Sequence, residues 1–459
     1  MKRERKRLDK WHPVRAHWRI AGGFAIATLV GALLLSLPLA SKAGHWIDYS
    51  TALFTATSAC CVTGLTIVDT GTTFSPFGQA VIIALIQLGG LGIMTFSTFL
   101  LVLVGRRLSI RDEFIISSSL GNIGVKGLSS LLRYALAMTL LLEIAGAAIL
   151  TWRYITNGYT TGKAIYYGLF HAISAFCNAG FSLHQNSLAP FAHDYIYLLT
   201  VSLLTLCGGL GFLVLYNLST FRFWKRNRRT RGRISLHTRI VIKMSLLLIF
   251  SAAAIFYCTE YHNAFHGMSP FKRIASSLFH AITVRTTGFT TIPFENFSAI
   301  GRSLSLNLAL IGGAPGSTAG GIKVTTVAVL ILTIRAMMRG HIETEIGGRT
   351  ISRIVVRQAM VVFILTIFTI TLLFNFLLLI ETPPLAANNT ELLLTEVVSA
   401  FSTVGFSLQV SPILSVAGRI TIVIAMLIGR LGPLAATLFI GTRDVGQHIY
   451  YPEEEVIVG

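Results

Sequence analysis

The chain has 459 residues, of which 53% are hydrophobic and only 12% are charged, and its mean hydropathy is +0.68. Soluble domains carry about 25% charged residues, so this composition excludes an ordinary soluble protein and predicts an all-α membrane protein. The net charge of +19 could indicate a nucleic-acid-binding protein, but its distribution argues against one. The basic segments alternate with long apolar runs instead of forming one face.

Basic residues mark the segments that connect the predicted spans. Of the 38 Lys and Arg, 28 lie in the N-terminal arm 1–19, in 106–133, 222–243 and 335–357, and in the C-terminal tail. The positive-inside rule places these segments on the cytoplasmic side. The arm is followed by an apolar run without a cleavage site, so we expect a retained first helix and not a removed signal.

Eight apolar runs are long enough to cross a bilayer, which requires about 20 residues. An even number of crossings puts both termini in the cytoplasm, and for a bacterium this means the inner membrane. In chain order the candidate spans are Ile20 to Ala40, Phe77 to Val104, Tyr134 to Thr156, Tyr195 to Phe221, Ile240 to Tyr257, Leu304 to Ile334, Met360 to Glu381 and Ile413 to Ile440.

Between the members of each successive pair of spans lies a shorter stretch that cannot cross. These stretches have similar sequences (LFTATSACCVTGL, LFHAISAFCNAGF, LFHAITVRTTGF and VVSAFSTVGF), and each ends at a glycine followed by a large apolar residue. They predict short re-entrant helices with a glycine turn. Their bounds are Tyr49 to Thr63, Ala164 to Ala179, Pro270 to Thr287 and Thr390 to Val404, and the turn glycines are Gly64, Gly180, Gly288 and Gly405.

The pattern of helix, re-entrant helix, glycine turn and helix therefore occurs four times. A second glycine-rich mark follows each turn by about 25 residues: LGGLG, GGLG, IGGAPG and IGRLGP. Two marks at matched offsets predict four pseudo-fourfold-related repeats, with eight transmembrane and four re-entrant helices in all. The predicted domains are the arm 1–19, repeat 1 at 20–105, repeat 2 at 131–224, repeat 3 at 238–338, repeat 4 at 356–441, and a cytoplasmic tail at 442–459.

Four such turns converging on one axis predict an ion filter lined by backbone carbonyl groups. Irregular backbone is tolerated at membrane depth only inside protein or beside water, and rings of carbonyl oxygens can replace the hydration shell of a cation. The helix precedes each glycine, so its partially negative C-terminal end faces the turn and favours a cation. The predicted filter residues are Val62, Thr63, Gly64, Asn178, Ala179, Gly180, Thr286, Thr287, Gly288, Thr403, Val404 and Gly405.

The second outer helix of repeat 3 has five glycines and a proline between Gly312 and Lys323. This density breaks a helix. It is not a nucleotide-binding Walker loop, because Ile322 separates Gly321 from Lys323. Arg430 lies in the middle of the last predicted span, where a charge is costly and usually functional. Its structural alternative is pairing with Glu143 or with a backbone carbonyl.

These residues resemble the Trk/Ktr/HKT potassium transporter superfamily, and most of all its KtrB-type membrane subunits. The resemblance extends from Ile20 to Ile440, and it implies potassium uptake, with sodium as a second candidate ion or co-transported ion. Thr403 to Phe406 reads almost like the potassium-channel TVGY, whereas the other three turns keep little beyond the glycine. This asymmetry predicts weaker discrimination between potassium and sodium than in a fourfold-identical filter.

The resemblance also implies that the broken segment of repeat 3 is a gate loop beneath the filter. Arg430 would repel cations or hold the loop carbonyls closed, Arg285 would brace its turn away from the axis, and Lys323 would anchor the loop. His171 and His280 occupy equivalent positions and are expected to pack. The predicted gate residues are Gly312, Gly313, Gly316, Ser317, Thr318, Gly320, Gly321, Lys323 and Arg430.

We expect no cofactor in this chain and no enzymatic activity, because its internal charges form no catalytic set. The family pairing implies a homodimer with one pore per protomer and a cytoplasmic nucleotide-binding ring of the KtrA type. The basic segments 106–133 and 222–243 would dock that ring or contact anionic lipid. The alternative function is a secondary transporter with a midplane substrate site, which usually has two repeats.

Overall fold

A computed structural model describes residues 14–92, 128–221, 234–341, 343–346, 348–381 and 390–441, with the backbone alone at 14–21, 128–132 and 432–441. Within these ranges the expected all-helical fold is confirmed, apart from a hairpin of two-residue strands, β1 (Glu345–Ile346) and β2 (Arg349–Thr350). Several predicted segments lie outside the described residues: the arm before residue 14, the end of the second predicted span, most of the basic segments 106–133 and 222–243, and the tail 442–459.

The segments predicted to be repeats 1 and 2 share the order of a long first helix, a short helix and a second outer helix, and differ in the short 3-10 and α turns between them. Repeat 1 comprises α2 (Val14–Ser36), η1 (Pro38–Ala40), α3 (Tyr49–Cys61), α4 (Thr70–Thr73) and α5 (Pro76–Leu91). Repeat 2 comprises α8 (Leu128–Thr156), α9 (Thr161–Phe176), η3 (Ala189–Phe191), α10 (Tyr195–Leu210) and α11 (Phe212–Thr220). Because α2 begins at Val14, the first helix starts inside the segment that was predicted to be the arm.

The last two repeats follow the same order and flank the hairpin. Repeat 3 comprises α13 (Leu236–Thr259), α14 (Pro270–Thr286), η4 (Phe294–Asn296), α15 (Ala299–Leu310) and α16 (Val324–Met338). Repeat 4 comprises α17 (Arg353–Ile380), α19 (Thr390–Ser402), η5 (Ser411–Ile413) and α20 (Val416–Gly441).

The four predicted re-entrant helices are α3, α9, α14 and α19. They contain 13, 16, 17 and 13 residues, so at 1.5 Å per residue each falls short of a bilayer core of about 30 Å. Capping side chains help to start them, since Asp48 accepts the backbone N–H of Thr51 and Ser269 accepts that of Lys272. Small residues dominate the buried face of α3, which allows close packing against neighbouring helices.

Among the described residues, three helices are long and apolar enough to cross a membrane: α8 over Arg133–Thr156, and the whole of α13 and of α17. A fourth candidate, predicted as one span from Tyr195 to Phe221, is instead two helices, α10 and α11, bent by 98°. The bend falls at Gly211, whose φ of +82° does not belong to a helix. Glycine tolerates this conformation at little cost, so the expectation of a continuous helix there is wrong.

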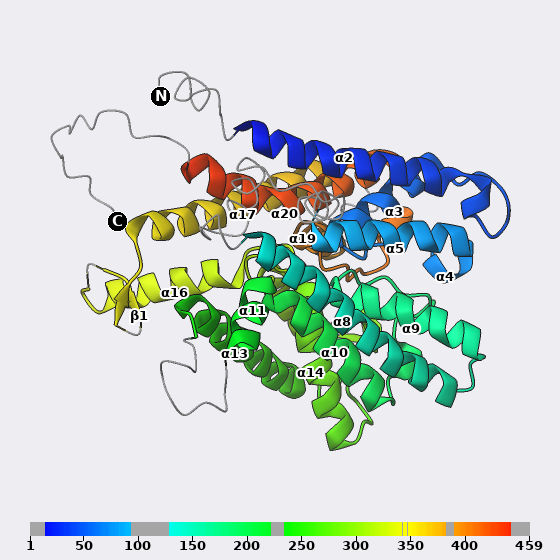
Figure 1. Cartoon of the computed structure of the whole chain (residues 1–459), viewed down its shortest axis with the longest axis horizontal. Coiled ribbons are helices and arrows are strands. Elements are labelled where there is room, and N and C mark those ends of the chain that lie inside the picture. Colours follow the sequence, from blue (N-terminus) through cyan, green and yellow to red (C-terminus); the bar gives the residue numbers. More distant parts are fainter. Residues whose placement is uncertain are drawn as a thin grey trace.

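Repeats 1 and 4 lie in one half of the view in Figure 1, and repeats 2 and 3 lie in the other. The second outer helix of each repeat contacts the short helix of the next: α5 contacts α9, α10 contacts α14, α15 contacts α19, and α20 contacts α3. The last of these contacts joins the C-terminal repeat to the first. The arrangement is therefore closed.

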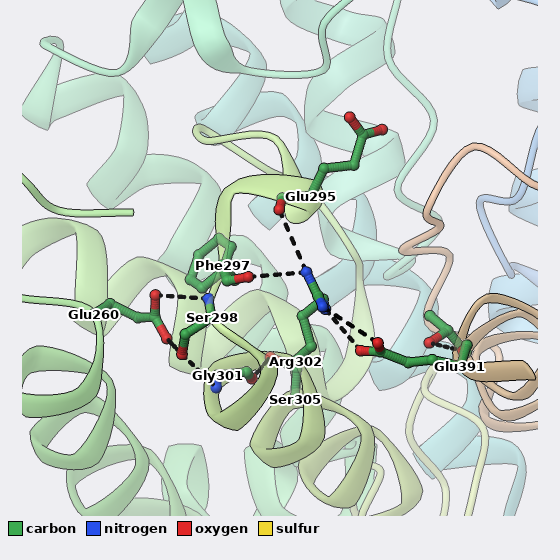
Figure 2. A network of polar contacts seen from close by, with 9 residues as sticks. Glu260, Glu295, Phe297, Ser298, Gly301, Arg302, Ser305 and Glu391 are labelled. Atoms are coloured by element: carbon green, nitrogen blue, oxygen red, sulfur yellow. Dashed lines mark hydrogen bonds and ion pairs between the residues drawn. The ribbon is translucent and has the colours of Figure 1, made fainter. Parts of the chain in front are cut away.

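Polar contacts join the two outer helices of repeat 3 and connect that repeat to the next (Figure 2). Glu260, at the end of α13, accepts hydrogen bonds from the Ser298 backbone N–H at 3.0 Å and from its hydroxyl at 2.5 Å, and Ser298 caps α15. Arg302 then forms a two-pronged ion pair with Glu391 of α19, at 2.7 and 3.2 Å.

Repeat 4 repeats this arrangement with other residues. Glu381, at the end of α17, accepts the hydroxyl and backbone N–H of Ser415, which caps α20. Arg419, one residue after Gly418 as Arg302 is after Gly301, donates to the hydroxyl of Ser50 in α3. In both connections, therefore, an arginine in the second outer helix of one repeat bonds a residue in the first turn of the next repeat's short helix.

Candidate functional site: four glycine turns and an interrupted helix

The four turn glycines lie against one another. A Cβ added to any of them would overlap a backbone carbonyl of the next repeat, and that carbonyl always belongs to the residue just before the next turn glycine. Gly64 faces the oxygen of Ala179, Gly180 that of Thr287, Gly288 that of Val404, and Gly405 that of Thr63. The contacts run in the order 1, 2, 3, 4 and return to 1, so the predicted filter residues are brought together in a closed ring of backbone.

Each turn requires its glycine because φ is positive, at +89° for Gly64, +71° for Gly180, +72° for Gly288 and +91° for Gly405. Three of the turns also hold the residue two positions earlier in the left-handed region: Val62 at +58°, Asn178 at +61° and Thr403 at +51°. For residues with a side chain this conformation costs about 1–3 kcal/mol, and such strain concentrates at functional sites.

Repeat 3 departs from this geometry. Helix α14 continues to Thr286, and the backbone N–H groups of Thr287 and Gly288 both donate to the carbonyl of Thr283 at 2.8 Å. The asymmetry seen in the sequence therefore extends to the backbone, since one of the four turns is built one residue shorter than the others.

The second glycine mark has a structural explanation. A Cβ at Gly89, Gly208 or Gly429 would overlap the carbonyl of the residue four positions before the turn glycine of the same repeat, namely Cys60, Phe176 or Phe401. Glycine at these positions lets the outer helix approach the end of the short helix at backbone distance. The matching residue of repeat 3, Gly312, faces the carbonyl of Gly320 instead.

Residues 311–323, between α15 and α16, form a largely buried loop at the point where the composition predicted a broken helix. The loop closes on itself through the bonds from Gly312 N to Ile322 O, at 2.9 Å, and from Ile322 N to Leu310 O, at 3.1 Å. It is also tied to the glycine mark of repeat 2, because Ala314 N donates to Gly209 O at 2.9 Å and Thr318 N to Gly208 O at 3.2 Å.

Arg430 stands where the other three marks have their second glycine. Its two terminal nitrogens donate to backbone carbonyls, one to Thr318 in the loop and the other to Gly89 in α5 at 2.5 Å. Of the two structural alternatives, the structure therefore has the carbonyl contact. Glu143 is paired elsewhere, since it accepts from Gln87 at 3.2 Å.

The other two basic side chains also contact the loop. Arg285, only 4% exposed, donates to the carbonyl of Gly312 at 3.3 Å. We had expected it to brace its own turn, but this bond braces the loop. Lys323 donates to the carbonyl of Ala319 at 2.8 Å, a bond within the loop. All three cations thus bind loop or neighbouring carbonyl groups.

Asn178 connects the ring to the loop. Its side-chain amide lies 2.6 Å from the hydroxyl of Thr318 and 2.8 Å from that of Thr287. The surrounding groups are best satisfied with the amide oxygen toward Thr318 and Gly209 and the amide nitrogen toward Thr287. A residue predicted to line the filter therefore also contacts a residue predicted to gate it.

Sequence reasoning did not single out Glu396, Ser174 or Ser399, although all three bond to the backbone or side chains around the turns. The available signal was a hydroxyl residue two positions after every turn glycine, in the tripeptides GLT, GFS, GFT and GFS. Among the described residues, no group of three or more His, Cys, Asp or Glu could hold a metal ion.

Comparison with known proteins agrees with this architecture. The sequence profile of the cation transport protein family TrkH matches residues 22–443. The chain belongs to this family. It is a multi-pass membrane protein and not an enzyme.

Two curated relatives match this family member over their full length. The potassium/sodium uptake protein NtpJ of Enterococcus hirae is 34% identical over 100% of this chain and 99% of its own. The Ktr system potassium uptake protein B of Bacillus subtilis is 34% identical over 99% of each. The crystal structure of the potassium transporter TrkH from Vibrio parahaemolyticus superposes with a TM-score of 0.66 at 19% identity, covering 92% of this chain and 85% of that one.

Proposed function

We propose that this protein takes up potassium across the bacterial inner membrane as a channel-like, ion-conducting subunit. The observation that carries the proposal is the closed ring in which each turn glycine faces a carbonyl of the next repeat. The names of the two curated relatives, a potassium/sodium and a potassium uptake protein, support the choice of ion. Potassium is here the cargo and not a resident cofactor.

The architecture proposed for this function is four pseudo-fourfold-related repeats, with eight transmembrane and four re-entrant helices, at 20–105, 131–224, 238–338 and 356–441. The cyclic contacts between each second outer helix and the next short helix support it. The tie at the end of each first outer helix adds support, because Glu260 with Ser298 and Glu381 with Ser415 recur at equivalent places. Both termini are then cytoplasmic.

The filter in this proposal consists of the three residues ending at each turn glycine. Short-helix C-termini point toward these turns, which favours a cation. Because the turn of repeat 3 is shorter and three of the four turns depart from the TVG sequence, discrimination between potassium and sodium is weaker than in a fourfold-identical filter. Sodium is therefore also a candidate cargo or co-transported ion.

The gate in this proposal is the loop 311–323, held in place by Arg430. The loop contacts the ring through Thr318 and Asn178, and the guanidinium of Arg430 donates to the carbonyl of Thr318. Holding the loop closed therefore accounts for these contacts better than repulsion of passing cations. Opening would require the loop to release at least these two partners.

The proposal includes a regulatory partner and a second copy of the chain. The relative from Bacillus subtilis is named as part of a Ktr system, which supports a cytoplasmic nucleotide-binding ring and a homodimer with one pore per protomer. The basic segments 106–133 and 222–243 are the proposed docking surfaces.

The test is growth of a potassium-uptake-deficient bacterium on low potassium, with this chain expressed alone and together with a candidate ring protein. We expect rescue that is strongest with the partner and that depends on Gly180. A chain that reaches the membrane in normal amounts but never restores growth or rubidium uptake would contradict the proposal. Saturable uptake of an organic solute would favour a secondary transporter instead.

A further inference from the structure

The position nine residues before the turn glycine carries a polar side chain in repeats 1, 2 and 4: Thr55, His171 and Glu396. In repeat 3, whose turn is one residue shorter, the equivalent is His280, eight residues before Gly288. All four are buried in the short helices, behind the ring. They are the obvious candidates to fix the strand that leaves each turn, because that strand carries a hydroxyl residue two positions after every glycine.

Two of the four make that contact. His171 Nε2 lies 3.1 Å from the hydroxyl of Ser182, and it also accepts the backbone N–H of Leu183 at 3.4 Å. Glu396 accepts the hydroxyl of Ser407 at 2.7 Å, and its other oxygen accepts the hydroxyl of Ser411. Ser182 and Ser407 are both two residues past their turn glycine. In repeats 2 and 4, therefore, a side chain on the short helix ties down the outgoing strand.

In the other two repeats the equivalent side chain bonds elsewhere. The hydroxyl of Thr55 donates to the carbonyl of Thr51 within α3, at 2.9 Å. His280 Nε2 lies 3.1 Å from the hydroxyl of Ser305 in the outer helix α15. The shorter turn of repeat 3 explains the second case, since losing one residue changes the register between the helix and its outgoing strand.

A second layer of contacts divides the repeats in the same way. Ser174, six residues before Gly180, donates to the carbonyl of Phe181 at 2.8 Å, and Ser399, six before Gly405, accepts the backbone N–H of Gly405 at 3.0 Å. In repeat 1 the matching hydroxyl, Ser58, is buried without a partner among the described residues. In repeat 3 Thr283 donates to carbonyls within its own helix.

We infer that two opposite strands of the ring are braced by their own short helices: His171 and Glu396 are positioning residues that fix the filter strands of repeats 2 and 4, whereas those of repeats 1 and 3 have no such brace. The strand of repeat 3 is bonded instead by Ser187 and Leu188 of repeat 2. Repeats 2 and 4 face each other across the ring, since the contacts run 1, 2, 3, 4 and back to 1. This inference rests on the proposed function and adds to it the residues that set potassium over sodium. Neither side chain is assigned to the ion itself.

The physical reason is the size difference between the two ions. In the size-based account of selectivity, a carbonyl ring discriminates against the smaller sodium ion because its oxygens resist moving inward. Two strands on opposite sides of the ring, each held by its own short helix, limit that movement. Loss of a brace should therefore change the ratio of potassium to sodium uptake more than it changes the maximal rate.

The test uses the full chain together with the candidate ring protein in proteoliposomes, with potassium and sodium uptake measured against ion concentration. The brace variants are H171A and E396A. H280A is the matched control for the first, because this histidine bonds an outer helix, and E391A is the control for the second, because Glu391 lies on the same helix and pairs with Arg302. S182A and S407A remove only the receiving hydroxyl, and they serve if an alanine variant of the brace fails to insert.

We expect H171A and E396A to lower the potassium-to-sodium uptake ratio about fivefold, the effect of roughly one hydrogen bond, with H280A and E391A close to wild type. E396Q should restore the ratio, since an amide can pair with both serines. The inference is overturned if the brace variants keep the wild-type ratio, if H280A lowers it as much as H171A, or if E396Q behaves like E396A. Absence of potassium uptake by the wild-type chain together with the ring protein would instead refute the proposed function.

Discussion

Replacement of Arg430 by alanine tests the gate most directly. The side chain donates to two backbone carbonyls, and only the bond to Thr318 holds the loop, since the bond to Gly89 fixes the arginine itself. A hydrogen bond from a charged donor contributes about 1.5–3 kcal/mol. R430A should therefore shift the loop toward the open state by about 10- to 150-fold, and uptake should no longer need the regulatory partner.

The assay is rubidium uptake by a potassium-uptake-deficient bacterium that expresses the chain without its partner, normalised to the amount of protein in the membrane. R419A is the matched control. Arg419 lies on the same helix and carries the same charge, but it bonds Ser50 and Pro412 and not the loop. Its partner-free uptake should stay at the wild-type level.

R430K separates the two roles considered for this residue. Lysine keeps the positive charge but lacks the planar fork that reaches two carbonyls. Repulsion of cations predicts wild-type behaviour for R430K, whereas a hydrogen-bonded closure predicts partner-free uptake between that of wild type and R430A. The reasoning fails if R430A is present at normal levels and its uptake still depends fully on the partner.

Three further predictions follow from the same contacts. G180A should abolish uptake while leaving the protein in the membrane, because its Cβ would overlap the Thr287 carbonyl. G267A is the control, because φ is also positive at Gly267 but an added Cβ there has open space. Equal uptake by the two variants would contradict the close contact between neighbouring turns. N178L should raise partner-free uptake by removing the amide between Thr318 and Thr287, and no rise in rubidium flux would count against the coupling. E260A should lower the free energy of unfolding by about 3–6 kcal/mol, because two hydrogen bonds from Ser298 to a charged carboxylate are lost. Thermal unfolding in detergent measures this against E295A, whose carboxylate makes no contact in the network of Figure 2, and equal melting temperatures would refute it.

The architecture could be predicted from local sequence patterns, which do not depend on tertiary contacts. Apolar runs, interleaved basic segments and the repeated glycine turns are read within windows of about 10 to 30 residues, and they gave the helical class, the four short helices and the interruption between Gly312 and Lys323. The direction of the short helices, and hence the preference for a cation, follows from the order of helix and glycine along the chain.

The details of the site required the tertiary structure. The 98° bend at Gly211 arises where the loop of repeat 3 packs on repeat 2, since Phe212 N donates to Gly316 O, and no periodicity within 195–221 announces it. The contact of Arg285 with Gly312 likewise depends on how α14 is placed against the loop 311–323. A shift of one residue along α14 would point the Arg285 side chain away from the Gly312 carbonyl.

What the sequence alone determined about this protein is its class, its fourfold repetition and the positions of its turns, because each depends on residues close together in the chain. Only the tertiary structure decided which carbonyl each glycine meets, which carbonyls Arg430 binds, and that His171 braces its strand while His280 does not. Those contacts join residues from different helices, and small differences in helix length and packing, which leave no mark in local composition, choose between them.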